Sequence, residues 1–422
     1  MRSRLVGIPC VLMLVVAGTV TTAGDWPGWR GPNRDDLSTE TGLLKSWPEG
    51  GPKKLWTSSQ VGIGYSGISV VGDVLYTMGA ESKEETAQEM IYALSVSSGE
   101  KLWQSPVGKA LDNKWGGGPR CTPTVAGDFV LGIGGQGDVV CVSAKDGSRI
   151  WAVSLKDLGG EIPNWGYCES PLVDGDRVLC TPGGEQGTVA CLNLKTGEKI
   201  WQSSDIKEKA HYSSVISVDH FGKHEYIQLT ELKVFGLDAE TGKLLWQADW
   251  PGRTAVIPTP IYHKGNVYVT SGYGVGCMLI SVSPDNQVQK IYDNKVMKNH
   301  HGGVILLNDH IYGHSDSVGW VCQNMATGEQ VWSEDGKNES KGSLAFAEGL
   351  LYCLKEGSGE CMLAEATPSG WKEISKFKLD PQSTQRSDRG KIWTHPTIAN
   401  GRLYLRDQEM LSSYDIKATE NR

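Results

Sequence analysis

The chain has 422 residues, with 41 Lys and Arg against 49 Asp and Glu, which gives a net charge of −8 at pH 7. With 39% hydrophobic and 21% charged residues it can bury a sizeable core, so disorder over most of its length is excluded. An acidic chain without long Lys/Arg runs is also a poor binder of nucleic acid, which is held by concentrated positive charge.

The N-terminus has the pattern of an export signal. Two early arginines precede an apolar stretch over residues 5–16, and a run of small residues ends at Ala23. This pattern predicts a signal peptide over residues 1–23. An uncleaved anchor is the weaker alternative, because the apolar stretch is shorter than the roughly 20 residues that span a bilayer. We therefore expect an exported protein of the periplasm, cell envelope or exterior, with no transmembrane segment after cleavage.

A repeat begins after an N-terminal arm, which we assign to residues 24–50. In each copy a small residue is followed six positions later by Gly and four positions after that by Trp, as in Ala93, Gly99 and Trp103. Successive Trp positions are 48, 50, 45 and 86 residues apart. Because 86 is twice 43, one copy must be degenerate, and the segment 278–292 supplies it with Tyr292 in the Trp position. The Trp residues assigned to this column are Trp56, Trp103, Trp151, Trp201, Trp246, Trp332 and Trp371.

Short predicted strands of the form Gly-Asp-x-x-Tyr recur eight times, from residues 72–76 to 400–404, about 47 residues apart. Alternating apolar and polar residues between Gly, Asp and Asn turns predict strands throughout. A period in the forties with four strands per unit is typical of propeller blades. We therefore predict an all-β, eight-bladed propeller of four-stranded antiparallel blades over residues 51–416, followed by a tail at 417–422. Pairing of the N-terminal strand around Trp56 with the C-terminal strands would close the ring.

The Trp-Gly unit is expected to be structural. Gly99 and its equivalents permit the positive φ of a tight turn, and the Trp that follows is large enough to wedge between neighbouring blades. Nine cysteines remain after residue 23, an odd number, and their pairing stays open. Cys141, Cys191 and Cys322 fall in the small-residue column, which favours packing. No Cys or His spacing typical of a metal site occurs, so no metal is predicted.

The repeats at 191–201 (CLNLKTGEKIW) and 236–246 (GLDAETGKLLW) resemble the PQQ-type (pyrroloquinoline quinone) β-propeller repeat family. The segment at 25–34 (DWPGWRGPNR) also resembles the leader of many exported propellers of this family. That resemblance implies the propeller fold over about residues 50 to 415. It is less specific for function, because the family includes quinoprotein dehydrogenases and the cofactor-free propeller of the bacterial outer-membrane protein assembly machinery.

Candidate site residues come from the segments that lead into the innermost strand of each blade, which we call lead-in segments. In a propeller they open on one face of the channel. Arg120 and Lys341 could hold an anionic or quinone-like cofactor, with Trp165 or Trp393 stacking on it. Glu169 or His395 could act as a catalytic base. The simpler interpretation, which we favour, is that a hydrated channel needs such polar groups anyway. The pair at 300–301 (His-His) is expected to lie in an exposed turn.

The quinoprotein dehydrogenases resemble one another in a vicinal Cys-Cys pair, which this sequence lacks. We therefore expect no cofactor, and a protein-binding or scaffolding module whose partners are other envelope proteins. The alternative is an alcohol or sugar dehydrogenase dependent on PQQ with calcium, which would take its small-molecule substrate in the central channel. A carbohydrate-binding propeller ranks third, because the abundant Trp and Tyr residues are mostly assigned to blade packing.

Overall fold

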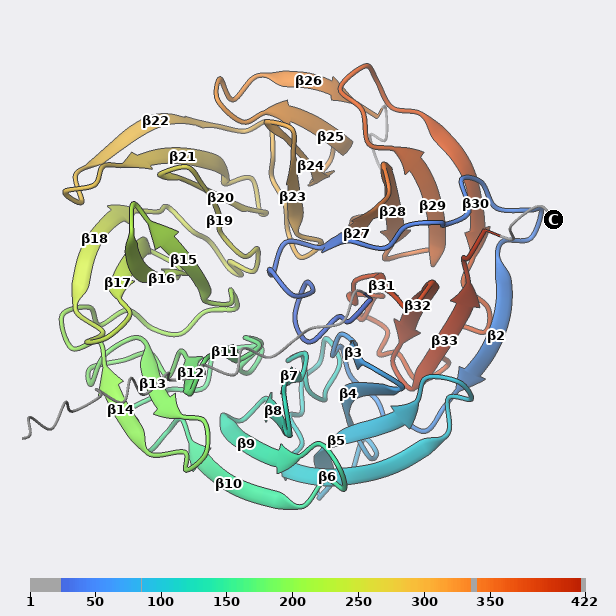
Figure 1. Cartoon of the computed structure of the whole chain (residues 1–422), viewed down its shortest axis with the longest axis horizontal. Helices are drawn as coiled ribbons and strands as arrows, with labels where there is room; N and C mark the ends of the chain where they lie inside the picture. The colour runs from blue at the N-terminus through green and yellow to red at the C-terminus, as the bar shows by residue number, and fades with distance from the viewer. Residues whose placement is uncertain (1–23, 85, 335–339, 419–422) are drawn as a thin grey trace, which may run out of the picture.

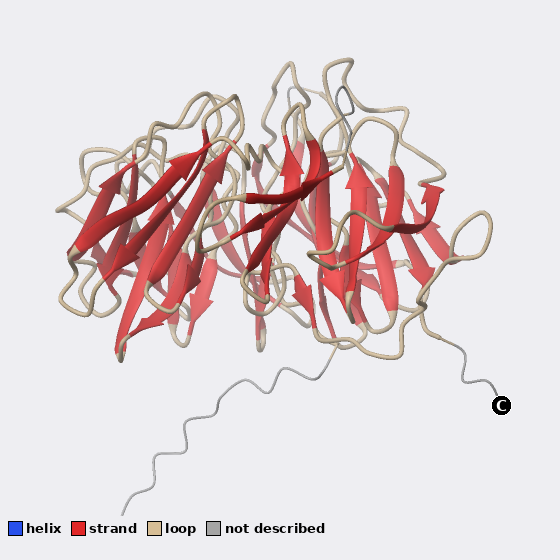
Figure 2. Cartoon of the chain, turned by 90° about the horizontal axis from the view of Figure 1, so that it is seen from above, coloured by secondary structure: helices blue, strands red, loops and turns tan. Residues whose placement is uncertain are grey.

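The computed structural model describes residues 24–84, 86–334 and 340–418, and the predicted signal peptide at 1–23 lies outside this range. The described chain is all-β and forms a ring of eight blades around a central axis, as predicted (Figure 1). Seen from the side, the strands of every blade run between two faces made of loops (Figure 2). The described part of the chain offers no helix with the length and apolarity to cross a bilayer.

Each blade is a meander whose first strand lies nearest the axis. Blades 1 to 4 comprise, in turn, β3 (Ser69–Val71), β4 (Val74–Ala80), β5 (Gln88–Ser95) and β6 (Lys101–Lys109); β7 (Thr124–Ala126), β8 (Phe129–Ile133), β9 (Asp138–Ser143) and β10 (Arg149–Ser154); β11 (Leu172–Asp174), β12 (Arg177–Cys180), β13 (Ala190–Asn193) and β14 (Lys199–Gln202); and β15 (Ile216–His220), β16 (Lys223–Leu229), β17 (Lys233–Asp238) and β18 (Leu244–Asp249).

Blades 5 to 7 comprise β19 (Ile261–His263), β20 (Asn266–Ser271), β21 (Gly276–Val282) and β22 (Val288–Asn294); β23 (Val304–Leu307), β24 (His310–Ser315), β25 (Gly319–Asn324) and β26 (Gln330–Ser333); and β27 (Gly342–Ala347), β28 (Leu350–Lys355), β29 (Glu360–Glu365) and β30 (Glu373–Lys378). Blade 8 joins β31 (Thr397–Ala399), β32 (Arg402–Asp407) and β33 (Met410–Asp415) to the N-terminal β2 (Lys53–Ser58).

The ring closes through this last blade, as predicted. β2 runs antiparallel to β33, with Lys53 opposite Asp415 and Ser58 opposite Leu411. Blade 7 differs from the prediction by one strand, because β1 (Leu37–Ser38) of the arm pairs in parallel with β27. Closure pairs one edge of β33 with β2, and the chain continues from β2 into blade 1. The last blade is therefore linked to the first.

The indoles of the repeat lie between blades. The Trp103 indole N–H donates to the Ala144 carbonyl of blade 2 at 3.2 Å, and a Cβ added at Gly147 would lie 2.5 Å from the Trp103 ring. A side chain at that glycine position would displace the ring, so the Trp and the glycine of the next blade form one packing unit. The indoles of Trp56, Trp151, Trp201 and Trp332 make the same kind of bond to Val96, Leu194, Ala239 and Thr367.

Blade 5 carries the degenerate copy. Tyr292 occupies the Trp register position opposite Leu279, and its hydroxyl donates to the Met325 carbonyl at 2.7 Å. The turn of blade 5 has no glycine, and the preceding Trp246 is oriented differently from the other indoles. Its N–H donates to Glu225 of its own blade at 2.9 Å, and its ring covers Gly236. The ring packs on the one small residue within reach.

Blade 7 has no tryptophan in this register. Ser375 occupies the position opposite Leu363, whereas Trp371 lies just before β30 and stacks on Trp320 of blade 6 at 6.2 Å. The missing indole comes from the arm, because Trp47 lies 5.9 Å from Tyr352, measured between ring centroids. The in-blade pairs formed by Trp103, Trp56 and Trp332 with Tyr76, Tyr404 and Tyr312 have the same spacing, at 5.8, 6.1 and 6.0 Å.

Candidate functional site at the channel

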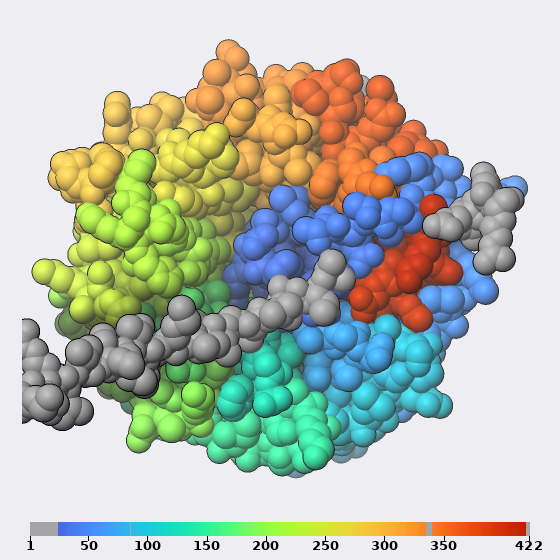
Figure 3. Space-filling view, in the orientation of Figure 1, coloured from blue at the N-terminus to red at the C-terminus, as the bar shows by residue number. Residues whose placement is uncertain are grey.

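The N-terminal arm passes over the centre of the ring and fills it from one face (Figures 1 and 3). Arg34 is buried and its guanidinium donates to the carbonyls of Ser170, Pro171 and Val215, at 2.5 to 3.1 Å. These acceptors precede the innermost strands of blades 3 and 4. A planar guanidinium with five donors suits several carbonyls that converge on one axis.

A second buried arginine anchors the same segment. Arg30 pairs with Asp36 at 2.5 Å and donates to the Val304 carbonyl of blade 6. Arg30, Arg34 and Asp36 all have positive φ, between 58° and 62°, a conformation that non-glycine residues rarely adopt. The contacts with the ring offset the cost of this backbone conformation. We call this segment, residues 29–36, the plug, and its contacts hold it against the wall of the channel.

Glu169, one candidate base, lies beneath this plug and is 2% exposed. Its carboxylate accepts from the backbone N–H of Thr181 at 2.6 Å and from the Thr181 hydroxyl at 3.0 Å. Burial raises the pKa of Glu169 to about 7, against the opposing effects of Thr181 and the charge of Arg34. Its oxygens are occupied by structural contacts, and the arm separates them from the face on which it lies.

His395, the other candidate base, is held by a different part of the arm and is 5% exposed. Its Nε2 lies 2.9 Å from the His301 carbonyl, its Nδ1 lies 3.4 Å from Asp36, and Trp29 packs on its ring at 4.6 Å. Although burial alone would raise the pKa of Asp36, the charges of Arg30 and His395 hold it below its ordinary value. Glu169 and His395 belong to blades 3 and 8, and each contacts its own part of the arm.

The cofactor candidates lie at the opposite mouth of the channel, in the lead-in segments. Arg120 lies over the ring of Tyr65 at 5.1 Å and donates to the Gly116 and Gly118 carbonyls. Tyr65 in turn lies 4.7 Å from Trp393, whose indole N–H donates to Glu356 at 2.8 Å. The structure thus joins Arg120 and Trp393 through Tyr65.

Lys341 belongs to a neighbouring cluster at this mouth. Its ammonium lies 3.4 Å from Asp316 and 2.8 Å from Nδ1 of His300. Burial, with the charge of Lys341, lowers the pKa of His300 to about 3, so this imidazole accepts a hydrogen bond from the ammonium as a neutral ring. The expectation of an exposed turn here is wrong, since His301 is 6% exposed and lies 3.6 Å from Glu356.

Trp165 lies apart from these contacts and packs edge-on against Tyr212 at 5.7 Å. As arranged, the candidate residues fit a flat, polyanionic quinone poorly. The ring of Trp393 is packed against Tyr65, and the Lys341 charge is paired with Asp316. Among residues 24–418 that are described, no group of three or more His, Cys, Asp or Glu side chains is placed to hold a metal ion.

Sequence reasoning missed the residues that fill the channel, namely Trp29, Arg30, Arg34 and Asp36. Their only signal is a run rich in Trp, Arg, Gly and Pro that stands before the repeat and has no counterpart within it. The nine cysteines of residues 24–418 are all free, and eight of them are buried. Those in the small-residue column pack in the blades, as expected.

The sequence model of a protein family, described as outer membrane protein assembly factor BamB, matches residues 87–334, more than half of the chain. The chain belongs to this family of PQQ-type repeat proteins. No curated protein sequence matches it. Membership agrees with the resemblance found in the repeats, and the matched range contains the five complete copies of the repeat together with the degenerate copy of blade 5.

Solved structures share the architecture of this family member but little of its sequence. BamB from Moraxella catarrhalis gives a TM-score of 0.61 at 14% identity, covering 86% of this chain and 100% of that one. A europium-containing methanol dehydrogenase gives 0.63 at 12% identity, covering 92% and 90%. The quinohemoprotein alcohol dehydrogenase from Comamonas testosteroni gives 0.61 at 9% identity, covering 96% and 82%. At these identities the likeness establishes the fold alone.

Proposed function

We propose that this protein is an exported, cofactor-free propeller that acts in the periplasm or cell envelope by binding other proteins. The observation that carries the proposal is the plug. Arg30, Arg34 and Asp36 are buried in the channel, so a ligand approaching from that face would have to displace contacts to three blades. A channel filled by its own chain leaves the outer surface of the ring as the working part of the molecule.

Exposed apolar side chains support a role in protein binding. Leu102 on the rim, Phe221 on the plugged face and Leu232 on the opposite face each leave more than half of their surface exposed. Exposed aliphatic and aromatic groups are typical anchors of protein interfaces. The family description, an outer membrane protein assembly factor, supports envelope partners, and the signal-like pattern of residues 1–23 supports export.

The alternative, a PQQ-dependent dehydrogenase, draws support from the two dehydrogenases of the same fold and from the mouth cluster. Arg120, Trp393 and Lys341 do gather at one mouth, and a flat ligand could stack there if Tyr65 moved from Trp393. PQQ would supply hydride-accepting chemistry, and Arg120 and Lys341 would hold its carboxylates. The present packing favours the cofactor-free interpretation.

Two measurements on the exported chain test this choice. Calorimetric titration with PQQ and Ca²⁺ should give no saturable heat, and a dye-linked assay on simple alcohols should give no turnover. Micromolar binding that Arg120→Ala or Lys341→Ala abolishes, while the exposed Lys114→Ala leaves it intact, would establish the dehydrogenase instead.

A photo-crosslinking residue at Leu102, Phe221 or Leu232 should form a discrete protein adduct in the cell, and adducts at none of the three would contradict a protein-binding role.

A further inference from the structure

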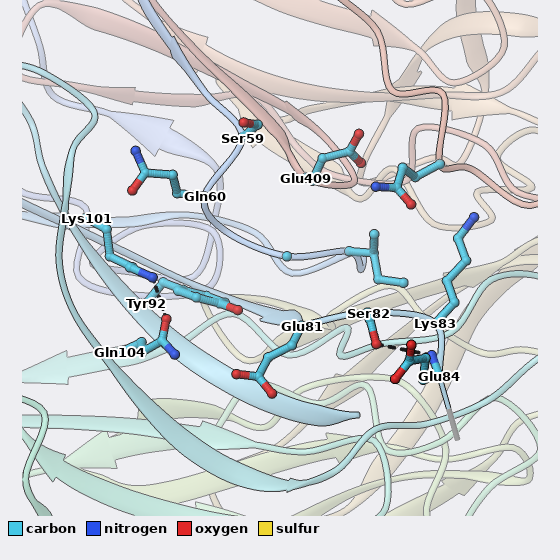
Figure 4. Close-up of a pocket in the computed structure, with 13 residues that line it drawn as sticks. Ser59, Gln60, Glu81, Ser82, Lys83, Glu84, Tyr92, Lys101, Gln104 and Glu409 are labelled. Atoms are coloured by element: carbon cyan, nitrogen blue, oxygen red, sulfur yellow. Dashed lines mark hydrogen bonds between the residues drawn. The ribbon is translucent and has the colours of Figure 1, made fainter. Parts of the chain in front are cut away.

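A groove of about 740 Å³ lies where the ring closes, between blades 8 and 1 and away from the channel (Figure 4). One side follows residues 59–63, which continue from β2. The other is formed by the turn at 81–84 between β4 and β5 and by side chains of β6, and Gln385 and Glu409 complete the lining from blade 8. Ligand sites in proteins have volumes of roughly 300 to 1,000 Å³.

Tyr92 contributes a phenol hydroxyl to this groove, while its ring is buried in the blade. The residue is 3% exposed, yet among the described residues its hydroxyl has no hydrogen-bond partner. A Cβ added at the neighbouring Gly62 would lie 3.1 Å from that oxygen, so the absence of a side chain there leaves it uncovered. Burial, with the charge of Glu81, raises the pKa of Tyr92 to about 12. The neutral hydroxyl has both a donor and an acceptor to offer a ligand.

The charges of the groove exclude a strongly charged ligand. Carboxylates of Glu81, Glu84 and Glu409 and the ammonium groups of Lys83 and Lys101 all line the groove (Figure 4). A cation would meet the two lysines and an anion the three glutamates, so neither sign gains across the whole site.

Apart from Gly62 and Ile63, the remaining lining is polar and neutral. Gln60, Gln104 and Gln385 contribute amides, which both donate and accept, and Ser59 and Ser82 contribute hydroxyls. Lys101 already donates to Gln104 at 2.6 Å, which orients that amide. An apolar ligand would leave these groups unpaired at a cost. A ligand whose own groups each donate and accept would pair with amides, hydroxyls, carboxylates and ammonium groups together.

We propose that this groove, between blades 8 and 1 where the ring closes, is a binding site for a neutral oligosaccharide of roughly two or three sugar rings. Each sugar hydroxyl is both a donor and an acceptor, so it can form a hydrogen bond with any of the amides, hydroxyls, carboxylates or ammonium groups of the lining. The Tyr92 hydroxyl would pair with one of them at the floor. This site is independent of the protein-binding role proposed above, because it lies at the closure seam and not at the three exposed apolar side chains.

Titration of the full exported chain with cellotriose, maltotriose and triacetylchitotriose, followed by calorimetry and ligand-observed NMR, tests the site. We expect saturable binding of at least one of them, weakened fivefold or more by Tyr92→Phe and by Gln104→Ala. Tyr92→Phe removes only an oxygen without a protein partner, so the fold is retained. Gln247→Ala is the matched control, because Gln247 is exposed and also follows a repeat Trp, in blade 4. It should leave binding unchanged.

Three results would overturn the proposal. The first is no saccharide binding up to about 10 mM, where even a weak site is occupied. The second is binding that survives both Tyr92→Phe and Gln104→Ala. The third is tighter binding of spermidine, triglutamate or tetraalanine than of every saccharide, weakened by the same two substitutions. This would show that the groove binds a cation, an anion or a peptide.

Discussion

Arg34 is the residue on which the filled channel most depends. Its guanidinium donates to carbonyls from two blades, and the charge of Glu169 lies close to it. Arg34→Ala would leave these carbonyls without donors and Glu169 without its neighbouring cation. We expect a loss of about 3 to 5 kcal/mol in the free energy of unfolding, because each buried carbonyl left without a donor costs about 1 to 3 kcal/mol, and urea denaturation measures this loss.

The matched control is Arg253→Ala, which removes an exposed arginine from a lead-in segment of blade 5. We expect a change within about 0.5 kcal/mol for this surface site. Equal midpoints for the two variants would show that the arm rests on the ring without stabilising it, and would remove the main support for the proposed function.

At the scale of single residues, the sequence predicted which side chains lie at the channel but not which groups they contact. Glu169 and His395 do lie at the channel, because both belong to lead-in segments. Their partners were not predictable, since Arg34 binds backbone carbonyls, and a carbonyl looks the same in every residue of the sequence. The burial of His301 was missed for a related reason: Glu356 and Trp393, which lie near it, come from other blades and are more than 50 residues away along the chain.

At the scale of elements, spacing predicted the blades because the repeat is local. Tyr292 was placed in the Trp register by counting residues alone, and the pairing with Leu279 confirms that position. Counting assigned Trp371 to the same column, but the turn before β30 differs in length and Ser375 takes the register position. The indole that packs against Tyr352 in blade 7 is Trp47. Because Trp47 is far from blade 7 in the sequence, no local pattern predicts this contact.

Trp47 should therefore matter as much as the in-blade tryptophans. It is buried against Tyr352 and Phe377, and its backbone N–H donates to Ser375. Trp47→Ala would open a cavity in blade 7, and we expect a loss of about 3 to 5 kcal/mol in the free energy of unfolding. Denaturant melts of Trp47→Ala and Trp103→Ala should agree to about 1 kcal/mol.

Lys45→Ala in the same arm provides the comparison, because it removes an exposed ion pair with Glu348 and an exposed hydrogen bond to the carbonyl of the same residue, together worth about 1 kcal/mol. A Trp47→Ala variant as stable as Lys45→Ala would contradict the role assigned to the arm in completing blade 7.

At the scale of the whole molecule, the arm and the closure strand act together. Residues 24–58 place β1 beside blade 7, Trp47 on its outer part and β2 in blade 8, with two arginines on the axis between. A ring of blades has no unpaired gap only when its ends meet. Here the same N-terminal stretch both closes the ring and fills its centre, so unfolding of the arm and opening of the ring are expected to be coupled.

Buried carboxylates should make the stability of this ring depend on pH. Glu89, on β5, accepts from the backbone N–H groups of Leu111 and Gly135, and burial raises its pKa from 4.5 to about 7, as for Glu169. The folded state then binds these protons more tightly than the unfolded state. Their contribution is complete below about pH 4.5 and is lost as the pH rises to about 7, by up to roughly 3 kcal/mol per group.

Glu89→Gln should flatten this dependence, because an amide has no proton to lose in that range. Urea melts at pH 4.5, 5.5 and 7 should show that the unfolding free energy of the wild type, relative to that of Glu89→Gln, falls as the pH rises. The exposed Glu49→Gln should leave the fall unchanged. Asp36 does not contribute to this change, because its pKa is lowered and its stabilisation is therefore already complete above the ordinary pKa of an aspartate. Burial lowers the pKa of His211, His300 and His301, so their contribution to stability rises over the same pH range, and the comparison with Glu89→Gln removes it. A difference in unfolding free energy between wild type and Glu89→Gln that stays constant from pH 4.5 to 7 would show that Glu89 stays ionised in the folded ring.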